Sequence, residues 1–120
     1  MKQIYRIEHK VGKHGMWRDF NGGINPLLEQ LPDDSPIKKI PMPDDNTYRY
    51  GEKEWFSAAA NKAILRHWFK KSDTQALLNL GYEICELTVT DYRVLSEFEV
   101  VFNREAIISK KVITLNELYK

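Results

Sequence analysis

The stretch SAAANKAILRHWFKKSDTQALLNLGYEICELTV, residues 57–89, decides the fold, because its apolar spacing changes from a helical period to a strand period. Within it, the segment 57–70 places Ala60, Ile64 and Trp68 four residues apart. Apolar residues at this spacing lie on one side of a helix. The sequence therefore predicts a first helix over 57–70, with one face turned to a core.

A second helix is predicted directly after the first. Ser72 and Gln75 have the spacing of a capping box, in which each side chain binds a free backbone N–H of the first turn. Gly81 suits the left-handed conformation that closes a helix, so this helix should run over 72–80. The strict alternation that follows predicts a half-buried strand over about 82–91.

The remaining strands are predicted from the same alternation of apolar and polar residues. We expect them over about 97–104 and 110–115, with an N-terminal strand over 2–10 whose inner face the sequence leaves open. The predicted fold class is α+β, a small antiparallel sheet with the two consecutive helices packed on one face. The side chains expected in the core are Trp68, Phe69, Leu77, Leu87, Val89, Val100 and Phe102.

Length and composition fit a single domain over residues 1–120. The chain has 18 basic and 17 acidic residues and a net charge of +1, which argues against a nucleic-acid-binding protein that depends on overall positive charge. The lone Cys85 excludes a disulfide within the chain and fits a reducing cytoplasm. With no apolar run long enough to span a bilayer and no signal peptide, we expect a cytoplasmic protein that does not enter a membrane.

A basic ridge is the first candidate binding surface. Lys62, Arg66 and Lys70 fall four residues apart on the first predicted helix, so their charges should line up along one face. Such a ridge would attract an anion. The plainer interpretation is the solvated face opposite the apolar stripe of an amphipathic helix.

A second group of candidates combines guanidinium, imidazole and aromatic side chains, the mixture that binds phosphates and stacks on bases. Its members are Arg6, His9, His14, Trp17, Arg18, Tyr48 and Arg49. The alternative is that they are unrelated surface and core residues, which spacing alone does not decide. No metal is expected, because the histidines and Cys85 lack the close paired spacing of a zinc site.

The tripeptide Glu97-Phe98-Glu99 lies at the start of a predicted strand, where two carboxylates at i and i+2 point the same way. It resembles the catalytic Glu-x-Glu motif of ADP-ribosyltransferases, which also have an arginine or histidine on the first strand, here Arg6 or His9. Their Ser-Thr-Ser strand has at most a degenerate counterpart in Thr88-Val89-Thr90. This resemblance implies an enzyme that uses NAD, and the alternative is an exposed strand face.

Several short motifs spread along the chain also resemble a group of small phage- and prophage-encoded accessory proteins. The motifs are Ile4 to His9, Gly15-Met16-Trp17-Arg18, Tyr48-Arg49-Tyr50-Gly51, Leu65-x-x-Trp68-Phe69, Leu77-x-x-Leu80-Gly81-Tyr82 and Glu99-Val100-Val101-Phe102. This resemblance implies an accessory phage protein working in the host cell and carries over no functional residue. Glu99 stands where glutamine is common in that group, which weighs against a catalytic role for it.

The function expected from the sequence is that of a non-enzymatic anti-defence protein. It would bind a host immune effector, such as a CRISPR complex, or a nucleotide immune signal, without a cofactor or a catalytic residue. The residues expected to bind are Arg6, His9, Trp17, Arg18, Tyr48, Arg49, Lys62, Arg66 and Lys70. The alternative is an ADP-ribosyltransferase-like enzyme, with Arg6 or His9 holding NAD and Glu99 or Glu97 polarising the ribose. The sequence leaves open whether the chain forms a homo-oligomer.

Overall fold

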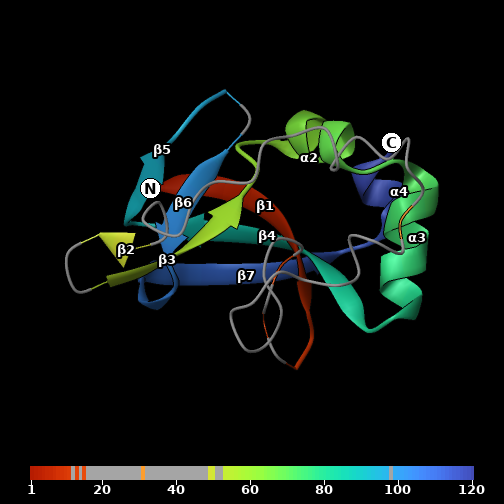
Figure 1. The fold of residues 1–120 in the computed structure, drawn as a ribbon, viewed down its shortest axis with the longest axis horizontal. Helices are drawn as coiled ribbons and strands as arrows, with labels where there is room; N and C mark the ends of the chain where they lie inside the picture. The colour runs from red at the N-terminus through yellow and green to blue at the C-terminus, as the bar shows by residue number, and fades with distance from the viewer. Residues whose placement is uncertain (12, 14, 16–30, 32–48, 51–52, 98) are drawn as a thin grey trace.

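The computed structural model describes residues 1–11, 13, 15, 31, 49–50, 53–97 and 99–120 (Figure 1). The strands of this part form two antiparallel sheets. One sheet has the spatial order β1 (Lys2–His9), β4 (Tyr82–Val89) and β7 (Ile107–Ile113). The other has the order β2 (Arg49–Tyr50), β3 (Lys53–Ala58), β6 (Val100–Asn103) and β5 (Tyr92–Val94). The predicted α+β class with antiparallel strands is therefore confirmed, but two small sheets replace the single sheet that was expected.

Two features join the sheets. Tyr5 of β1 and Ala59, just after β3, exchange backbone hydrogen bonds of 2.9 and 2.7 Å. On the other side, β4 continues through a turn into β5, while β6 leads through the 3₁₀ helix η3 (Arg104–Ala106) into β7. The space between the sheets is thus bounded by the Tyr5–Ala59 bridge on one side and by the β4–β5 and β6–β7 connections on the other.

The helices gather at one end of the molecule together with the C-terminus (Figure 1). They are α2 (Lys62–Trp68), α3 (Lys71–Asn79) and the short α4 (Leu115–Leu118). One face of the β1-β4-β7 sheet packs against them through Tyr5, Ile7 and Ile84. The opposite face packs against the second sheet through Ile4 and Leu87. From the sequence alone, neither face of the first strand could be assigned to the core. The structure explains this, because both faces of β1 are buried.

The residues predicted for the core are all buried, which confirms this prediction. They are Trp68, Phe69, Leu77, Leu87, Val89, Val100 and Phe102. They divide between the two faces, since the first three belong to the helix-side cluster and the last four pack between the sheets.

The predicted start of each helix was wrong. Residues 57 and 58 belong to β3, where Ala58 pairs with Val100, and α2 begins only after Asn61, whose side chain accepts a 2.8 Å hydrogen bond from Ile64 N. In α3 the predicted capping serine lies inside the helix, and Asp73 Oδ2 instead accepts from Lys70 N at 3.4 Å. The predicted end of the second helix agrees with the structure, since Gly81 follows it with a φ of 94°.

Candidate functional site

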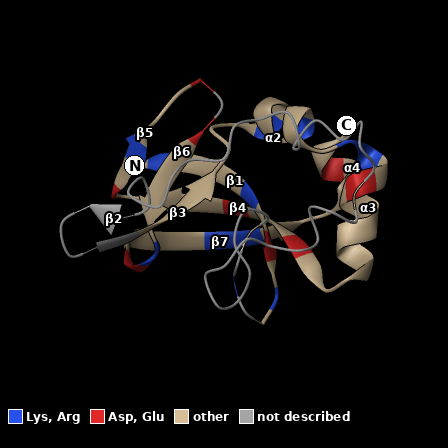
Figure 2. Ribbon diagram, in the orientation of Figure 1, with Lys and Arg blue, Asp and Glu red and all other residues tan. Residues whose placement is uncertain are grey.

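A buried cluster of ion pairs lies on the face of β1 and β4 that meets the second sheet. Its centre is Glu8, a side chain with 0% exposed surface. Arg6 Nε lies 2.9 Å from Glu8 Oε1, and Arg104 donates to both carboxylate oxygens at 3.0 and 2.9 Å. Lys110 Nζ lies 3.2 Å from Glu8 Oε2 and 2.7 Å from Glu83 Oε2. Figure 2 shows the basic stretch of β7 beside the acidic residues of β1 and β4.

The strand registers explain why these charges meet. Arg6 and Glu8 lie two residues apart on β1, so both side chains point to the same face. Glu8 stands directly opposite Glu83 on β4, and Lys110 stands opposite Leu87 on the next strand. Like charges opposite each other are destabilising, and the shared Lys110 ammonium offsets the repulsion between the two carboxylates.

The cations around Glu8 keep it ionised. Burial alone would raise the pKa of Glu8, but the hydrogen bond from Arg104 and the charges of Arg6 and Arg104 lower it to about 2. Burial lowers the pKa of Arg6, while the charge of Glu8 opposes that shift. For Lys110, burial lowers the pKa, but its hydrogen bonds to Glu83 and Glu8 and the nearby Cys85 raise it overall. The cluster is therefore a set of mutually dependent charges.

The folded chain should lose stability in acid because of Glu8. Its pKa falls from an ordinary value of 4.5 to about 2 on folding, so its contribution is present above pH 4.5 and is lost as the pH falls towards 2. A shift of this size corresponds to on the order of 3 kcal/mol of unfolding free energy. Urea unfolding at pH 7, 4 and 2.5 measures this loss. A free energy of unfolding that stays constant over this range would contradict the role given to Glu8.

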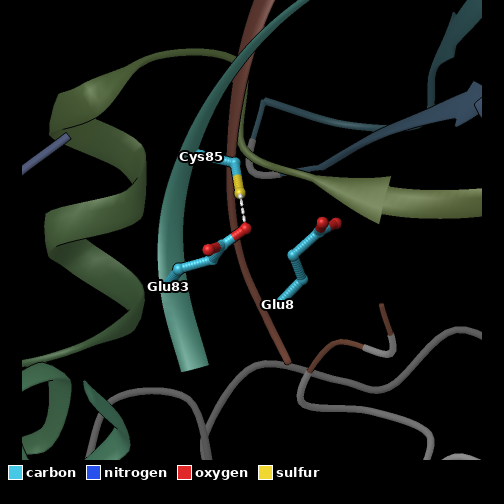
Figure 3. A group of neighbouring side chains, drawn as sticks. All are labelled: Glu8, Glu83 and Cys85. Atoms are coloured by element: carbon cyan, nitrogen blue, oxygen red, sulfur yellow. Dashed lines mark hydrogen bonds between the residues drawn. The ribbon is translucent and has the colours of Figure 1, made fainter. Parts of the chain in front are cut away.

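Glu8, Glu83 and Cys85 also bring potential metal-ligating atoms within 4.8 Å of one another. Figure 3 shows the Cys85 thiol directed at Glu83, a contact of 3.7 Å, with the Glu8 carboxylate beside them. A metal ion would have to displace the ammonium and guanidinium groups that already face these oxygens. Burial and the negative charge of Glu8 raise the pKa of the Cys85 thiol to about 12, so it is neither a ready ligand nor a nucleophile. The arrangement favours an ion-pair network over a metal centre.

The same cluster extends through Arg6 to a serine and a second buried carboxylate. Arg6 Nη1 donates to the Ser57 carbonyl oxygen at 2.7 Å, and Ser57 Oγ donates a hydrogen bond to Glu99 Oε2. Arg6 and Glu99 are buried, with 4% and 8% of their surface exposed. Because Ser57 pairs with Val101 in the β3–β6 register, its hydroxyl lies close to the chain that enters β6. Phe56, Ala58, Val100 and Phe102 point between the sheets, and the Arg6 guanidinium lies beside the two rings on that face. The side chains of Ser57 and Glu99 extend from the opposite face of the β3–β6 pair, so Arg6 meets Ser57 through its backbone oxygen.

The Arg6 guanidinium is enclosed by aromatic rings and by backbone. The ring centroids of Phe56 and Phe102 lie 5.7 and 5.6 Å from its central carbon, within the range of a cation–π contact. On another side, Lys13 O accepts from Nη2 at 3.0 Å. A Cβ atom on Gly15 would lie 3.1 Å from Nη2, so glycine allows the backbone to approach this closely. The charge is thus held in a defined position.

The family model for the bacteriophage T4 Y00F protein matches residues 1–116 of this chain. The chain belongs to the bacteriophage T4 Y00F protein family. The match spans Glu8, Ser57 and Glu99, so the whole candidate site lies within the part that defines the family. No curated protein and no solved structure matches the chain. The expectation of a phage protein is confirmed at the level of this family.

In this Y00F-family chain the structure separates the residues that the ADP-ribosyltransferase resemblance left as alternatives. Arg6 reaches Ser57, whereas His9 lies on the opposite face of β1, with its ring 5.3 Å from that of Tyr82. Glu99 is buried and bonded to Ser57, whereas Glu97 is exposed. Arg6 is thus linked to Glu99 through the backbone and the side chain of Ser57, whereas His9 lies on the other face of β1 and Glu97 is exposed.

The basic ridge does not form as one continuous helix face, because α2 ends at Trp68. Arg66 Nη1 donates to Leu118 O at 2.8 Å, and Lys62 Nζ lies 5.9 Å from the centroid of the Tyr5 ring. Lys70 is exposed at the junction between α2 and α3. The ridge residues thus have separate roles in the fold.

Other predicted binding residues fall where the structure gives no side-chain description. Arg49 belongs to β2, whose backbone pairs with β3. Trp17, Arg18 and Tyr48 lie outside the described residues, as does His14. Among the described helices, none is long and apolar enough to cross a membrane.

Sequence reasoning missed Ser57, Glu8, Arg104 and Lys110 as functional candidates. Ser57 was assigned to a helix, although it occupies a polar position between Phe56 and Ala58 in a short alternating segment. Arg6 and Glu8 are two charges within a strand whose other central residues are apolar or aromatic, and charges that become buried require partners. These two charges were the signal that the sequence offered for a buried network.

Proposed function

We propose that this phage protein is an ADP-ribosyltransferase that uses NAD to modify a host defence protein. The observation that carries the proposal is the chain of contacts from Arg6 through Ser57 to Glu99. The arginine on the first strand and the last residue of a Glu-x-Glu pair are two of the elements named by the resemblance, and Ser57, which is not part of a Ser-Thr-Ser sequence, connects them.

Each residue has a chemical role that its environment supports. The Arg6 guanidinium offers a positive charge and planar N–H donors to the phosphates of the dinucleotide. When the bond between nicotinamide and ribose C1′ breaks, positive charge develops on the ribose, and the Glu99 carboxylate stabilises it. Ser57 orients that carboxylate through its hydroxyl hydrogen bond. A nucleophilic atom of the acceptor protein then bonds to C1′ and gives its proton to water, while neutral nicotinamide departs.

Access to Arg6 requires a local movement. Lys13 O and Gly15 lie against its guanidinium, which has 4% of its surface exposed. A dinucleotide that binds Arg6 displaces this backbone contact and replaces a neutral acceptor with a charged one, which is the stronger hydrogen bond. The expected location is the host cytoplasm, where NAD and immune effectors such as a CRISPR complex occur together.

Purified protein incubated with NAD labelled in its adenylate part and a host lysate tests the proposal. We expect covalent label on host protein with the unmodified chain and none with the Glu99→Gln variant. Label that is absent with the unmodified chain would overturn the proposal. Label that is equally strong with Glu99→Gln would exclude Glu99 as the stabilising carboxylate.

Non-enzymatic binding of a host immune effector or a nucleotide immune signal is the second candidate. It is favoured by the exposure of Lys70 and Lys71 at the junction of α2 and α3, beside the half-buried Lys62. Exposed charges of this kind attract an acidic partner, with attraction screened over about 8 to 10 Å at physiological salt. Trp17 would supply a stacking or hot-spot contact.

The triple change of Lys62, Arg66 and Lys70 to glutamate tests this second candidate. If the ridge binds the partner, the folded variant should lose inhibition of the host defence, and higher salt should weaken binding by the unmodified chain. Circular dichroism is the folding control, because Arg66 also holds Leu118 O. Full inhibition by the folded variant would remove the ridge from consideration.

A further inference from the structure

Arg6 has three polar neighbours besides the rings of Phe56 and Phe102, and among them only Glu8 is charged. Nη1 and Nη2 donate to backbone oxygens of Ser57 and Lys13, at 2.7 and 3.0 Å. Nε lies 2.9 Å from Glu8 Oε1, a close ion pair whose angle is not that of a hydrogen bond. A free arginine side chain has many rotamers, so a guanidinium that is ready to bind must be fixed by its neighbours. Glu8 is the neighbour that supplies the opposite charge, and the two backbone oxygens supply directed hydrogen bonds.

Glu8 is itself fixed by groups from another part of the chain. Arg104 grips both of its oxygens, and Lys110 bonds one of them. These cations come from η3 and β7, whereas Glu8 and Arg6 lie on β1. The carboxylate is fully buried and bonded by two cations, so it presents a negative charge at a fixed place beside Arg6.

We propose that Glu8 is a positioning residue that sets the orientation of Arg6 for binding the phosphates of a dinucleotide. This inference rests on the proposed function of Arg6 and adds to it the residue on which that function depends. Glu8 would not touch the dinucleotide. It would act through Arg6, so its loss should weaken NAD binding more than it slows the chemical step.

Glu83 provides a matched control within the same cluster. It lies opposite Glu8 and forms an ion pair with Lys110 at 2.7 Å. Among the described residues it has no ion pair with Arg6. Glu83→Gln therefore removes a carboxylate of the same cluster without touching Arg6, and Glu8→Gln removes the carboxylate that holds it.

Kinetics of nicotinamide release from NAD are the first measurement. We expect Glu8→Gln to raise the KM for NAD roughly tenfold or more, with kcat within about twofold of the unmodified chain. Glu83→Gln should leave both constants nearly unchanged. Because Glu8→Gln leaves the buried Arg6 and the partly exposed Arg104 and Lys110 without their shared anion, it is also made together with Lys110→Met, which restores the net charge. An equal rise in KM for the Glu8 and Glu83 variants, or no rise for Glu8→Gln, would overturn the inference.

The Nε–H signal of Arg6 in a nitrogen-15 NMR spectrum is the second measurement, and it does not require turnover. We expect a signal protected from exchange in the unmodified chain and in Glu83→Gln, and rapid exchange with water when Glu8 is replaced. If the Arg6 Nε–H signal stays protected in Glu8→Gln, the positioning role of Glu8 is wrong, regardless of the result of the kinetic measurement. If the protection of the Arg6 Nε–H signal depends on Glu8 but the unmodified chain does not release nicotinamide from NAD, the proposed function is wrong. The inference that Glu8 positions Arg6 would then still hold.

Discussion

Glu99→Gln is expected to slow nicotinamide release from NAD about 100- to 1000-fold, which is the size of effect seen when one preorganised electrostatic group is removed from an active site. The substitution keeps the shape of the side chain and an oxygen that still accepts from Ser57 Oγ. It removes the negative charge that would face the ribose as nicotinamide leaves. The measurement is the initial rate of nicotinamide release at saturating NAD, with thermal unfolding as the check on folding.

Glu97→Gln is the matched control for this prediction. Glu97 carries the same carboxylate two residues away, but its side chain is exposed, and Ser57 bonds to Glu99 instead. Nicotinamide release by this variant should stay close to that of the unmodified chain. If Glu97→Gln slowed release as much as Glu99→Gln, the assignment of the buried carboxylate would be wrong.

Phe102→Ala is expected to lower the free energy of unfolding by about 3 to 5 kcal/mol, and Leu87→Ala by about 2 to 5 kcal/mol. Both side chains have 0% exposed surface and lie between the two sheets. Phe102 also packs its ring 6.0 Å from that of Phe56 and 5.6 Å from the Arg6 guanidinium, so its removal leaves a cavity beside a buried charge. Urea unfolding monitored by circular dichroism measures the change.

The control for these core variants is Val112→Ala on β7. This side chain is 54% exposed, so its truncation should change the unfolding free energy by about 0.5 kcal/mol or less. A loss of under about 1 kcal/mol for Phe102→Ala would show that the two sheets do not pack as described.

The parts of the fold that sequence predicted well are those set by local patterns. The helix over 71–79 and the strand that follows Gly81 carry their own periodicity and their own end signal. The helix predicted to begin at residue 57 was wrong over residues 57–60, because the three alanines there favour a helix locally. In the folded chain Ala58 pairs with Val100, and Ala59 bonds the backbone of Tyr5, and these distant strand pairings outweigh local propensity.

The candidate site was predicted only in fragments. The Glu-x-Glu resemblance named Arg6 or His9 and Glu97 or Glu99, and it placed a degenerate serine strand at Thr88-Val89-Thr90, whereas in the structure the hydroxyl that bonds Glu99 belongs to Ser57 of β3. The partners of Glu8 lie 96 and 102 residues away in the sequence. Contacts over such separations depend on which strands pair. The single sheet expected from the sequence did not place β3 or η3 beside β1, so these contacts could not be predicted.

Titration of the nitrogen-15-labelled protein with NAD, followed by backbone amide NMR, tests most directly whether Arg6, Ser57 and Glu99 form one dinucleotide site. We expect saturable shifts of the amide signals at these three residues, and unchanged signals at Lys62 and Arg66. Shifts confined to Lys62 and Arg66, or no saturable shift at all, would contradict the account.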